Sequence, residues 1–271
     1  MIGHGLAALL AAVGIGLVQP AATGAGADRP DPYSAVVGVT GRDNRPERER
    51  GIGEAFTEVM VKVTGDRTIL AHPRFGQVRA AAEDAVRDLR YRDRKEGVQV
   101  SDEQGTRDRS FELTVVFEPI AIDNVARALD AEPWTGERPT VRVLLGVTDS
   151  MRSYVLASDT EPGYGQREIF RTLSQRRGID LAIPTASELG EAGLDNEAVA
   201  TLVETARQPA RDVAGPFLTG VMVMDATGFW TTRWRLVDRD TVLDWQDPPT
   251  TFDRGIADAV DRTIRHLARL D

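Results

Sequence analysis

The segment 217–224 constrains the fold most, because it is apolar on both of its alternating faces. This pattern is typical of a buried central strand. A second stretch, 229–247, divides into two strands that a two-residue hairpin can join. In that register Trp234 lies opposite Trp245, and the apolar residues, Trp230 included, share one face. The sequence therefore predicts a helix-covered sheet in this half of the chain.

The predicted C-terminal domain spans residues 141–271. Its first strand, 141–147, precedes a long polar loop at 149–165, and its last helix carries an apolar stripe over 253–269. The predicted order of elements is β-α-β-α-α-β-β-β-α. Its other predicted elements are a helix ended by Gly178, a strand at 179–183, and helices at 186–192 and 197–207.

The predicted N-terminal domain spans residues 32–132, in the order β-α-α-β-β-α. Asn44 can cap its first helix and Gly65 can end it. Residues 133–140 hold two prolines and a glycine and are predicted to be a linker. The predicted elements of the N-terminal domain are a strand at 33–39, helices at 44–64 and 73–89, strands at 91–100 and 110–118, and a short helix after Pro119. We expect an α+β or α/β fold of two small domains, each with a mixed or mostly antiparallel sheet covered by helices.

The N-terminus is typical of an export signal. Residues 6–18 form an apolar run that is too short to cross a bilayer as a helix, and Ala25-Gly26-Ala27 offers a cleavage site. Residues 1–27 are therefore predicted to be a signal peptide. Because they lack Lys and Arg, either the signal is atypical or the true start lies upstream. An uncleaved anchor is the alternative. No other segment is long and apolar enough to cross a membrane, so we expect a soluble periplasmic protein.

The composition excludes several kinds of chemistry. The chain has no cysteine, which excludes disulfides, thiolate metal sites and a cysteine nucleophile. Its net charge of -9 disfavours nucleic-acid binding. The histidines are few and scattered, and no nucleotide loop or serine-hydrolase elbow is present. We therefore predict no catalytic, cofactor-binding or metal-binding residues and no cofactor.

Two groups of residues are candidates for recognition. The first is Thr64, Asp66 and Arg67 at a predicted helix end, although a glycine cap followed by a solvated Asp–Arg pair explains the same pattern. The second is Trp230, Trp234 and Trp245, which form either a stacking platform for glycan rings or an aromatic ladder under the last helix.

Aspartates also cluster along the last three predicted strands. They admit a glycosidase-type carboxylate pair, although turn formation explains most of them. These aspartates are Asp225, Asp238, Asp240, Asp244 and Asp247.

Four short motifs occur in order along the chain. They are Val61–Arg67, Trp134 with Arg138-Pro139, Gly178–Leu181 with Pro184, and Gly228-Phe229-Trp230 with Trp234. Together they resemble the proteobacterial family called domain of unknown function 2066. The resemblance implies an exported protein and supplies no activity.

These observations favour a non-enzymatic protein of the cell envelope that binds another envelope protein or acts as an accessory or assembly factor. The alternative is a protein that binds cell-wall glycans or hydrolyses them with a carboxylate pair. The first hypothesis predicts an apolar or aromatic surface patch. The second predicts facing carboxylates in a cleft beside exposed tryptophans.

Overall fold

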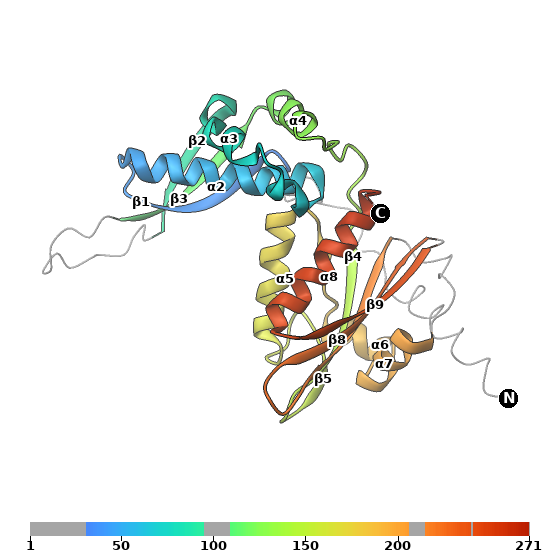
Figure 1. Ribbon diagram of the computed structural model, residues 1–271. Helices are drawn as coiled ribbons and strands as arrows, with labels where there is room; N and C mark the ends of the chain where they lie inside the picture. The colour runs from blue at the N-terminus through green and yellow to red at the C-terminus, as the bar shows by residue number, and fades with distance from the viewer. Residues whose placement is uncertain (1–30, 95–108, 206–214, 240, 271) are drawn as a thin grey trace, which may run out of the picture. The chain divides into compact units, whose positions relative to one another are not determined.

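The computed structural model describes residues 31–94, 109–205, 215–239 and 241–270 (Figure 1). They divide into an N-terminal unit, built mainly from residues 31–136, and a C-terminal unit, built mainly from residues 137–175 and 179–267. Each unit has one sheet covered by helices, which confirms the predicted α+β fold class. The predicted signal peptide lies outside the described residues. Within the described ranges, no helix has the length and apolar character needed to cross a bilayer.

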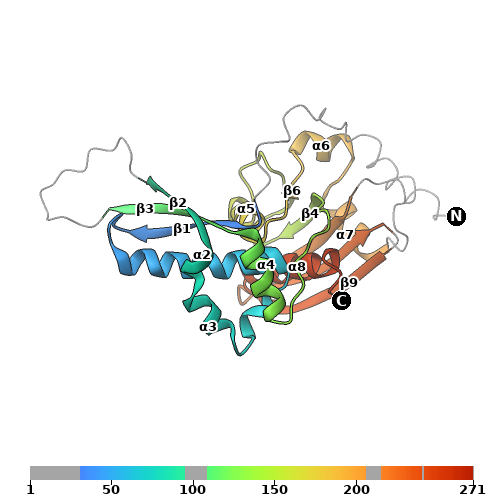
Figure 2. The same cartoon turned by 90° about the horizontal axis from the view of Figure 1, so that it is seen from above.

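The N-terminal unit is a three-stranded antiparallel sheet in the order β1-β3-β2, formed by Ser34–Thr40, Ser110–Phe117 and Val86–Asp93. Helix α2, Arg45–Thr64, lies across one face of this sheet (Figures 1 and 2). Asn44 caps the helix by accepting a hydrogen bond from the N–H of Glu47, and Gly65 ends it at a φ of 70°. Helix α4, Pro119–Ala128, packs on α2.

The predicted helix at 73–89 is wrong. Helix α3 covers only Phe75–Ala80, a 3₁₀ turn spans Ala82–Ala85, and the chain then enters β2 at Val86. The apolar residues of this segment have helical spacing, but two of them belong to a strand: Val86 and Leu89 lie opposite Phe117 and Val115 in β3. Tertiary strand pairing thus overrides a local helical pattern. Residues 95–100 of the strand predicted at 91–100 lie outside the described part of the chain.

The C-terminal unit has a larger mixed sheet. Its strand order is β5-β4-β7-β8-β9, and β6 also pairs with β4. Strands β4 and β7 are parallel, whereas β5, β8 and β9 each run antiparallel to a neighbour. The strands are β4, Val141–Thr148; β5, Ser153–Val155; β6, Leu181–Ala182; β7, Phe217–Met224; β8, Trp230–Asp238; and β9, Thr241–Thr250. The predicted hairpin register is confirmed, because Trp234 lies opposite Trp245.

Helices cover both faces of this sheet. Helix α8, Phe252–Leu267, covers the face that carries Thr232, whose hydroxyl lies beside Gly255. Helix α7, Asn196–Thr205, covers the opposite face, where Val199 and Val203 pack on Val221 of β7. Helices α5, Tyr164–Arg177, and α6, Ala186–Glu191, complete the unit.

The predicted loop at 149–165 contains a strand that the sequence pattern missed. Asp149 accepts hydrogen bonds from the N–H groups of Met151 and Arg152, at 2.8 and 2.9 Å, and so folds a tight turn. The chain then returns along β4 as β5. This strand ends one side of the sheet and β9 ends the other.

Candidate functional site

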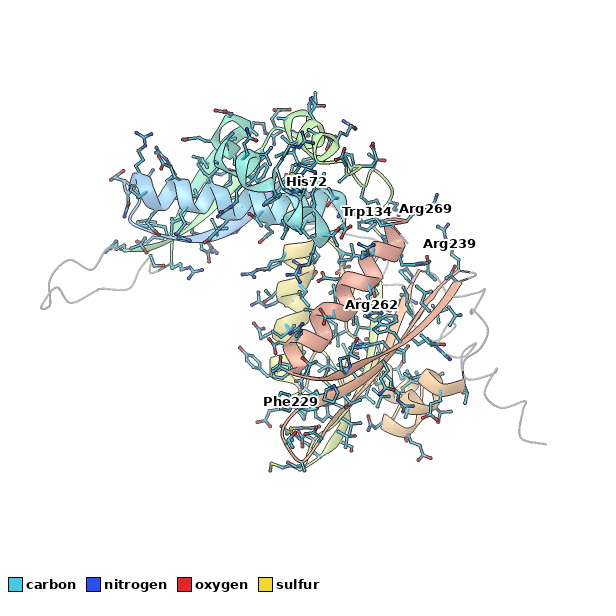
Figure 3. The ribbon with its side chains drawn as sticks, viewed as in Figure 1. His72, Trp134, Phe229, Arg239, Arg262 and Arg269 are labelled. Atoms are coloured by element: carbon cyan, nitrogen blue, oxygen red, sulfur yellow. The ribbon has the colours of Figure 1, made fainter. Side chains whose placement is uncertain are left out.

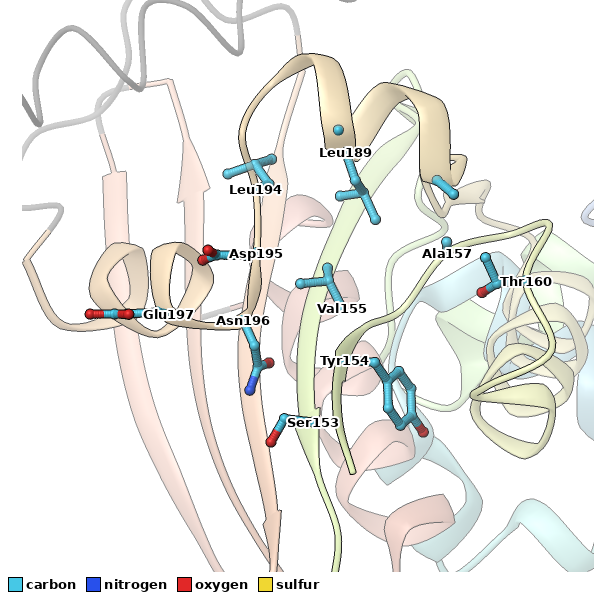
Figure 4. Close-up of a pocket in the computed structure, with 12 residues that line it drawn as sticks. Ser153, Tyr154, Val155, Ala157, Thr160, Leu189, Leu194, Asp195, Asn196 and Glu197 are labelled. Carbon is cyan, nitrogen blue, oxygen red and sulfur yellow. The ribbon is translucent and has the colours of Figure 1, made fainter. Parts of the chain in front are cut away.

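An open groove of about 520 Å³ lies beside β5 in the C-terminal unit (Figure 4). It runs between the edge of β5, helix α6 and the first turn of α7. Its floor is apolar and formed by Val155, Ala157, Leu189 and Leu194, which belong to or pack on one hydrophobic cluster. We call this feature the β5 groove.

A chain of hydrogen bonds fixes one wall of the β5 groove. The Nδ2 of Asn196 donates to the Oγ1 of Thr148 at 3.1 Å, and that hydroxyl lies 2.9 Å from the Oγ of Ser153. The Oδ1 of Asn196 is sealed from solvent without a hydrogen-bond partner among the described residues, and it lies over Gly146. A Cβ at position 146 would lie 2.5 Å from this oxygen. The close packing of α7 on β4 therefore requires glycine there.

Both helices at the β5 groove have capped N-termini. Thr185 and Glu188 form a reciprocal capping box at α6, and Asp159 accepts from the N–H of Ala186 at 2.8 Å. Asp195 accepts from the N–H of Ala198 in the first turn of α7, also at 2.8 Å. Side-chain oxygens thus already occupy helix N–H groups that would otherwise attract an anion.

The aromatic ring beside the β5 groove is not poised for catalysis. Burial raises the pKa of the Tyr154 phenol above its ordinary value, and the positive charge of Arg152 opposes this shift. The guanidinium of Arg152 lies 5.6 Å from the centre of the Tyr154 ring. A phenol with a raised pKa stays protonated at neutral pH and is a poor nucleophile.

The predicted residues Thr64, Asp66 and Arg67 lie where α2 ends. The hydroxyl of Thr64 donates to the carbonyl of Met60 at 2.7 Å. Asp66 caps the following 3₁₀ helix by accepting from the N–H of Thr68 at 2.8 Å. Thr64 and Asp66 therefore hold the chain at this corner, whereas the side chain of Arg67 is exposed. A role for the three in recognition stays a prediction.

Thr64 and Asp66 also line a second cavity, of about 710 Å³. His72 and Trp134, labelled in Figure 3, contribute to it as well. The Nε2 of His72 lies 3.4 Å from a carboxylate oxygen of Asp130. None of the described residues forms a group of three or more His, Asp and Glu side chains with metal-binding geometry.

The predicted tryptophan group lies mostly under α8. Trp230 and Trp234 are buried. The guanidinium of Arg262 on α8, labelled in Figure 3, lies 5.8 Å from the ring centre of the half-buried Trp245. The structure therefore has the aromatic ladder under the last helix, which was the alternative to a glycan platform. The burial of Trp230 and Trp234 leaves these rings no face for a sugar.

The sequence did not indicate that polar atoms are buried in this ladder. Four of them are sealed from solvent without a hydrogen-bond partner in the described residues: Thr232 Oγ1, Trp234 Nε1, Trp245 Nε1 and Asp247 Oδ2. Burial raises the pKa of the Asp247 carboxyl; Arg262 opposes the shift and Asp258 reinforces it. The indole N–H of Trp234 also opposes it, from a position outside hydrogen-bonding geometry.

Each of the other described aspartates among those predicted interacts with a different partner. Asp225 accepts from the N–H and hydroxyl of Thr227, at 2.8 and 2.6 Å, and these bonds lower its pKa. Asp238 lies 3.2 Å from His266, and Asp244 binds the guanidinium of Arg235. Asp240 lies outside the described residues.

Comparison with known proteins gives one family match. Residues 27–135 match a family model described as a domain of unknown function (DUF8605). The resemblance to domain of unknown function 2066 is therefore wrong, because the matched family is a different one. The motif Val61–Arg67 misled because a glycine helix end followed by a capping Asp serves local geometry in any fold. No curated protein and no solved structure matches the chain.

Proposed function

We propose that this chain is a non-enzymatic protein of the cell envelope that binds another protein through the β5 groove. One observation carries the proposal: a groove of about 520 Å³, with the half-buried Val155 and the buried Leu189 and Leu194 in its lining, lies beside the edge of a sheet. A concave site with an apolar lining and a few polar groups is where proteins typically bind another molecule. The envelope location rests on the signal-like residues 1–27.

The lining of the β5 groove favours binding over catalysis. The ionisable side chains in it are Tyr154, Asp195 and Glu197. Asp195 is engaged in capping α7, and Tyr154 holds its proton at neutral pH. A binding role uses the apolar floor, whereas a hydrolase would need a positioned acid and base. The glycan alternative has less support, because Trp230 and Trp234, two of the three rings on which it rested, are buried.

Site-specific photo-crosslinking in the native host tests this proposal. Gly190 and Gly76 are matched positions, because both are exposed helical glycines around which an added Cβ meets no atom within 4 Å. Gly190 lines the β5 groove, whereas Gly76 lies in α3 of the N-terminal unit. We expect a benzophenone amino acid at position 190, and not at position 76, to give a discrete protein adduct in the envelope fraction. Equal adducts at both positions, or none at 190, would contradict the proposal.

A further inference from the structure

The backbone of β5 is open on its outer side. In the antiparallel pair with β4, the N–H of Asp149 donates to the carbonyl of Arg152 at 3.0 Å, and that of Leu156 donates to Leu145 at 2.8 Å. Bonded pairs alternate along such a ladder, so Tyr154 faces β4. The N–H and C=O groups of the residues on either side of it, 153 and 155, therefore point away from the sheet.

These outward groups have no backbone partner among the residues that the structure describes, since β5 pairs only with β4. The opposite edge of the sheet differs. Strand β9 carries Pro248 and Pro249, which have no N–H to offer to another strand. Strand β5 has the sequence Ser-Tyr-Val, without proline or charge, and the β5 groove runs along its open side.

The charges at the rim define what fits there. Asp195 and Glu197 line the β5 groove and are exposed, and its lining holds no Lys or Arg from the described part of the chain. Arg152, just before β5, pairs with Asp149 and stacks on Tyr154. The charged side chains of the lining are therefore two exposed carboxylates, which make the rim acidic. It is complementary to Lys or Arg side chains.

We propose that the β5 groove binds an extended segment of a partner protein that adds a strand to the outer edge of β5 and carries Lys or Arg beside Asp195 and Glu197. Main-chain hydrogen bonds to Ser153 and Val155 supply affinity. The apolar floor takes alternate side chains of the added strand, and the acidic rim selects basic ones. This inference rests on the proposed function and names the chemistry of the partner.

Two substitutions at one position isolate the backbone contribution. Ser153→Pro removes an N–H that faces away from β4 and so leaves the β4–β5 ladder intact, whereas Ser153→Ala keeps that N–H. Both variants lose the hydroxyl that lies 2.9 Å from that of Thr148, so the N–H is what distinguishes them. With the benzophenone at position 190, we expect the adduct of Ser153→Pro to be about a tenth of that of Ser153→Ala. Circular dichroism and thermal unfolding of each purified variant check that the fold is retained.

A second pair of variants tests the charge. Asp195→Asn combined with Glu197→Gln keeps a capping oxygen at α7 while it removes both rim charges. We expect this double variant to reduce the adduct about three- to tenfold, and the control Asp253→Asn, on α8, to leave it unchanged. Digestion of the adduct at acidic residues, followed by mass spectrometry, should yield a partner segment with Lys or Arg at the crosslink.

The outcomes separate this inference from the proposed function. An adduct at position 190 that survives Ser153→Pro would overturn strand addition while protein binding stands. An adduct that resists the double variant, or whose partner segment is acidic, would overturn the basic partner. If position 190 gives no adduct in the unsubstituted chain, both the inference and the proposed function fail.

Discussion

The buried carboxyl of Asp247 should make the stability of the C-terminal unit depend on pH. Asp247 is only 6% exposed, and its Oδ2 has no hydrogen-bond partner in the described residues. The charges that face it come from α8: Arg262 favours the carboxylate and Asp258 disfavours it, while burial dominates and raises the pKa. A raised pKa means that the folded state holds the proton more tightly than the unfolded chain does. The stability that neutral Asp247 contributes is therefore complete below the ordinary pKa of 3.8 and is lost as the pH rises through the folded-state pKa.

Asp247→Asn tests this reasoning, since the amide stays neutral at every pH. Leaving a buried polar group unsatisfied costs about 1–3 kcal/mol, so the Asn variant should have a free energy of unfolding higher by about that amount at pH 7.5. Thr232 lies opposite Asp247 in the ladder, and its hydroxyl, which has no partner among the residues that the structure describes, can accept from the new amide. Each kcal/mol should raise the melting temperature by about 2–4 °C.

The assay is urea unfolding followed by tryptophan fluorescence at a series of pH values from 4 upward. The difference between the two proteins should shrink toward zero as the pH approaches the ordinary pKa of the carboxyl. Asp244→Asn is a control of opposite sign on the same strand, because Asp244 binds the buried guanidinium of Arg235 at 2.5 and 2.9 Å. A pH-independent difference, or a less stable Asn variant at neutral pH, would refute the argument.

Three further substitutions test the packing and the caps by urea unfolding. Gly146→Ala should lower the free energy of unfolding by about 1–3 kcal/mol, because its Cβ would lie 2.5 Å from Asn196 Oδ1; a neutral result would show that α7 can move away. Gly190→Ala, in open helical space, should raise it by about 0.5–1 kcal/mol, and a loss would mean that this helix is not formed. Asp66→Ala should lower it by about 1 kcal/mol through the lost cap to Thr68, and an unchanged value would show that water replaces the cap.

The fold was predictable wherever one element repeats a clear period over many residues. The apolar residues that share one face of β8 and β9, Trp234 and Trp245 among them, predicted the hairpin register, because a slip of one residue would move them to the other face. Helix α2 was recognisable from its apolar stripe and from Asn44 and Gly65 at its ends. The helix predicted at 73–89 failed because its helical spacing was coincidental, and pairing with β3 decided the conformation from Val86 onward.

The β5 groove could not be predicted from the sequence. Strand β5 is three residues long, too short to show alternation, and it lies inside a polar stretch that resembles a loop. Its floor joins Val155, Leu189 and Leu194, which stand on separate elements and look like ordinary core residues. The end of α2 was easier to predict. The sequence already offered a glycine cap as the explanation for the pattern around Thr64 and Asp66, and both side chains form local hydrogen bonds there.

The aromatic ladder under α8 and the β5 groove differ in which of their groups a partner can reach. The distinctive side chains, Trp234 and Asp247, are closed under α8, so their polar atoms act on stability and not on a ligand. The open feature, the β5 groove, offers backbone N–H and C=O groups at Ser153 and Val155, whose side chains are ordinary. Because backbone groups are the same for every residue except proline, no side-chain motif marks such an edge. Proline is therefore the substitution that separates recognition through the backbone from recognition through side chains at β5.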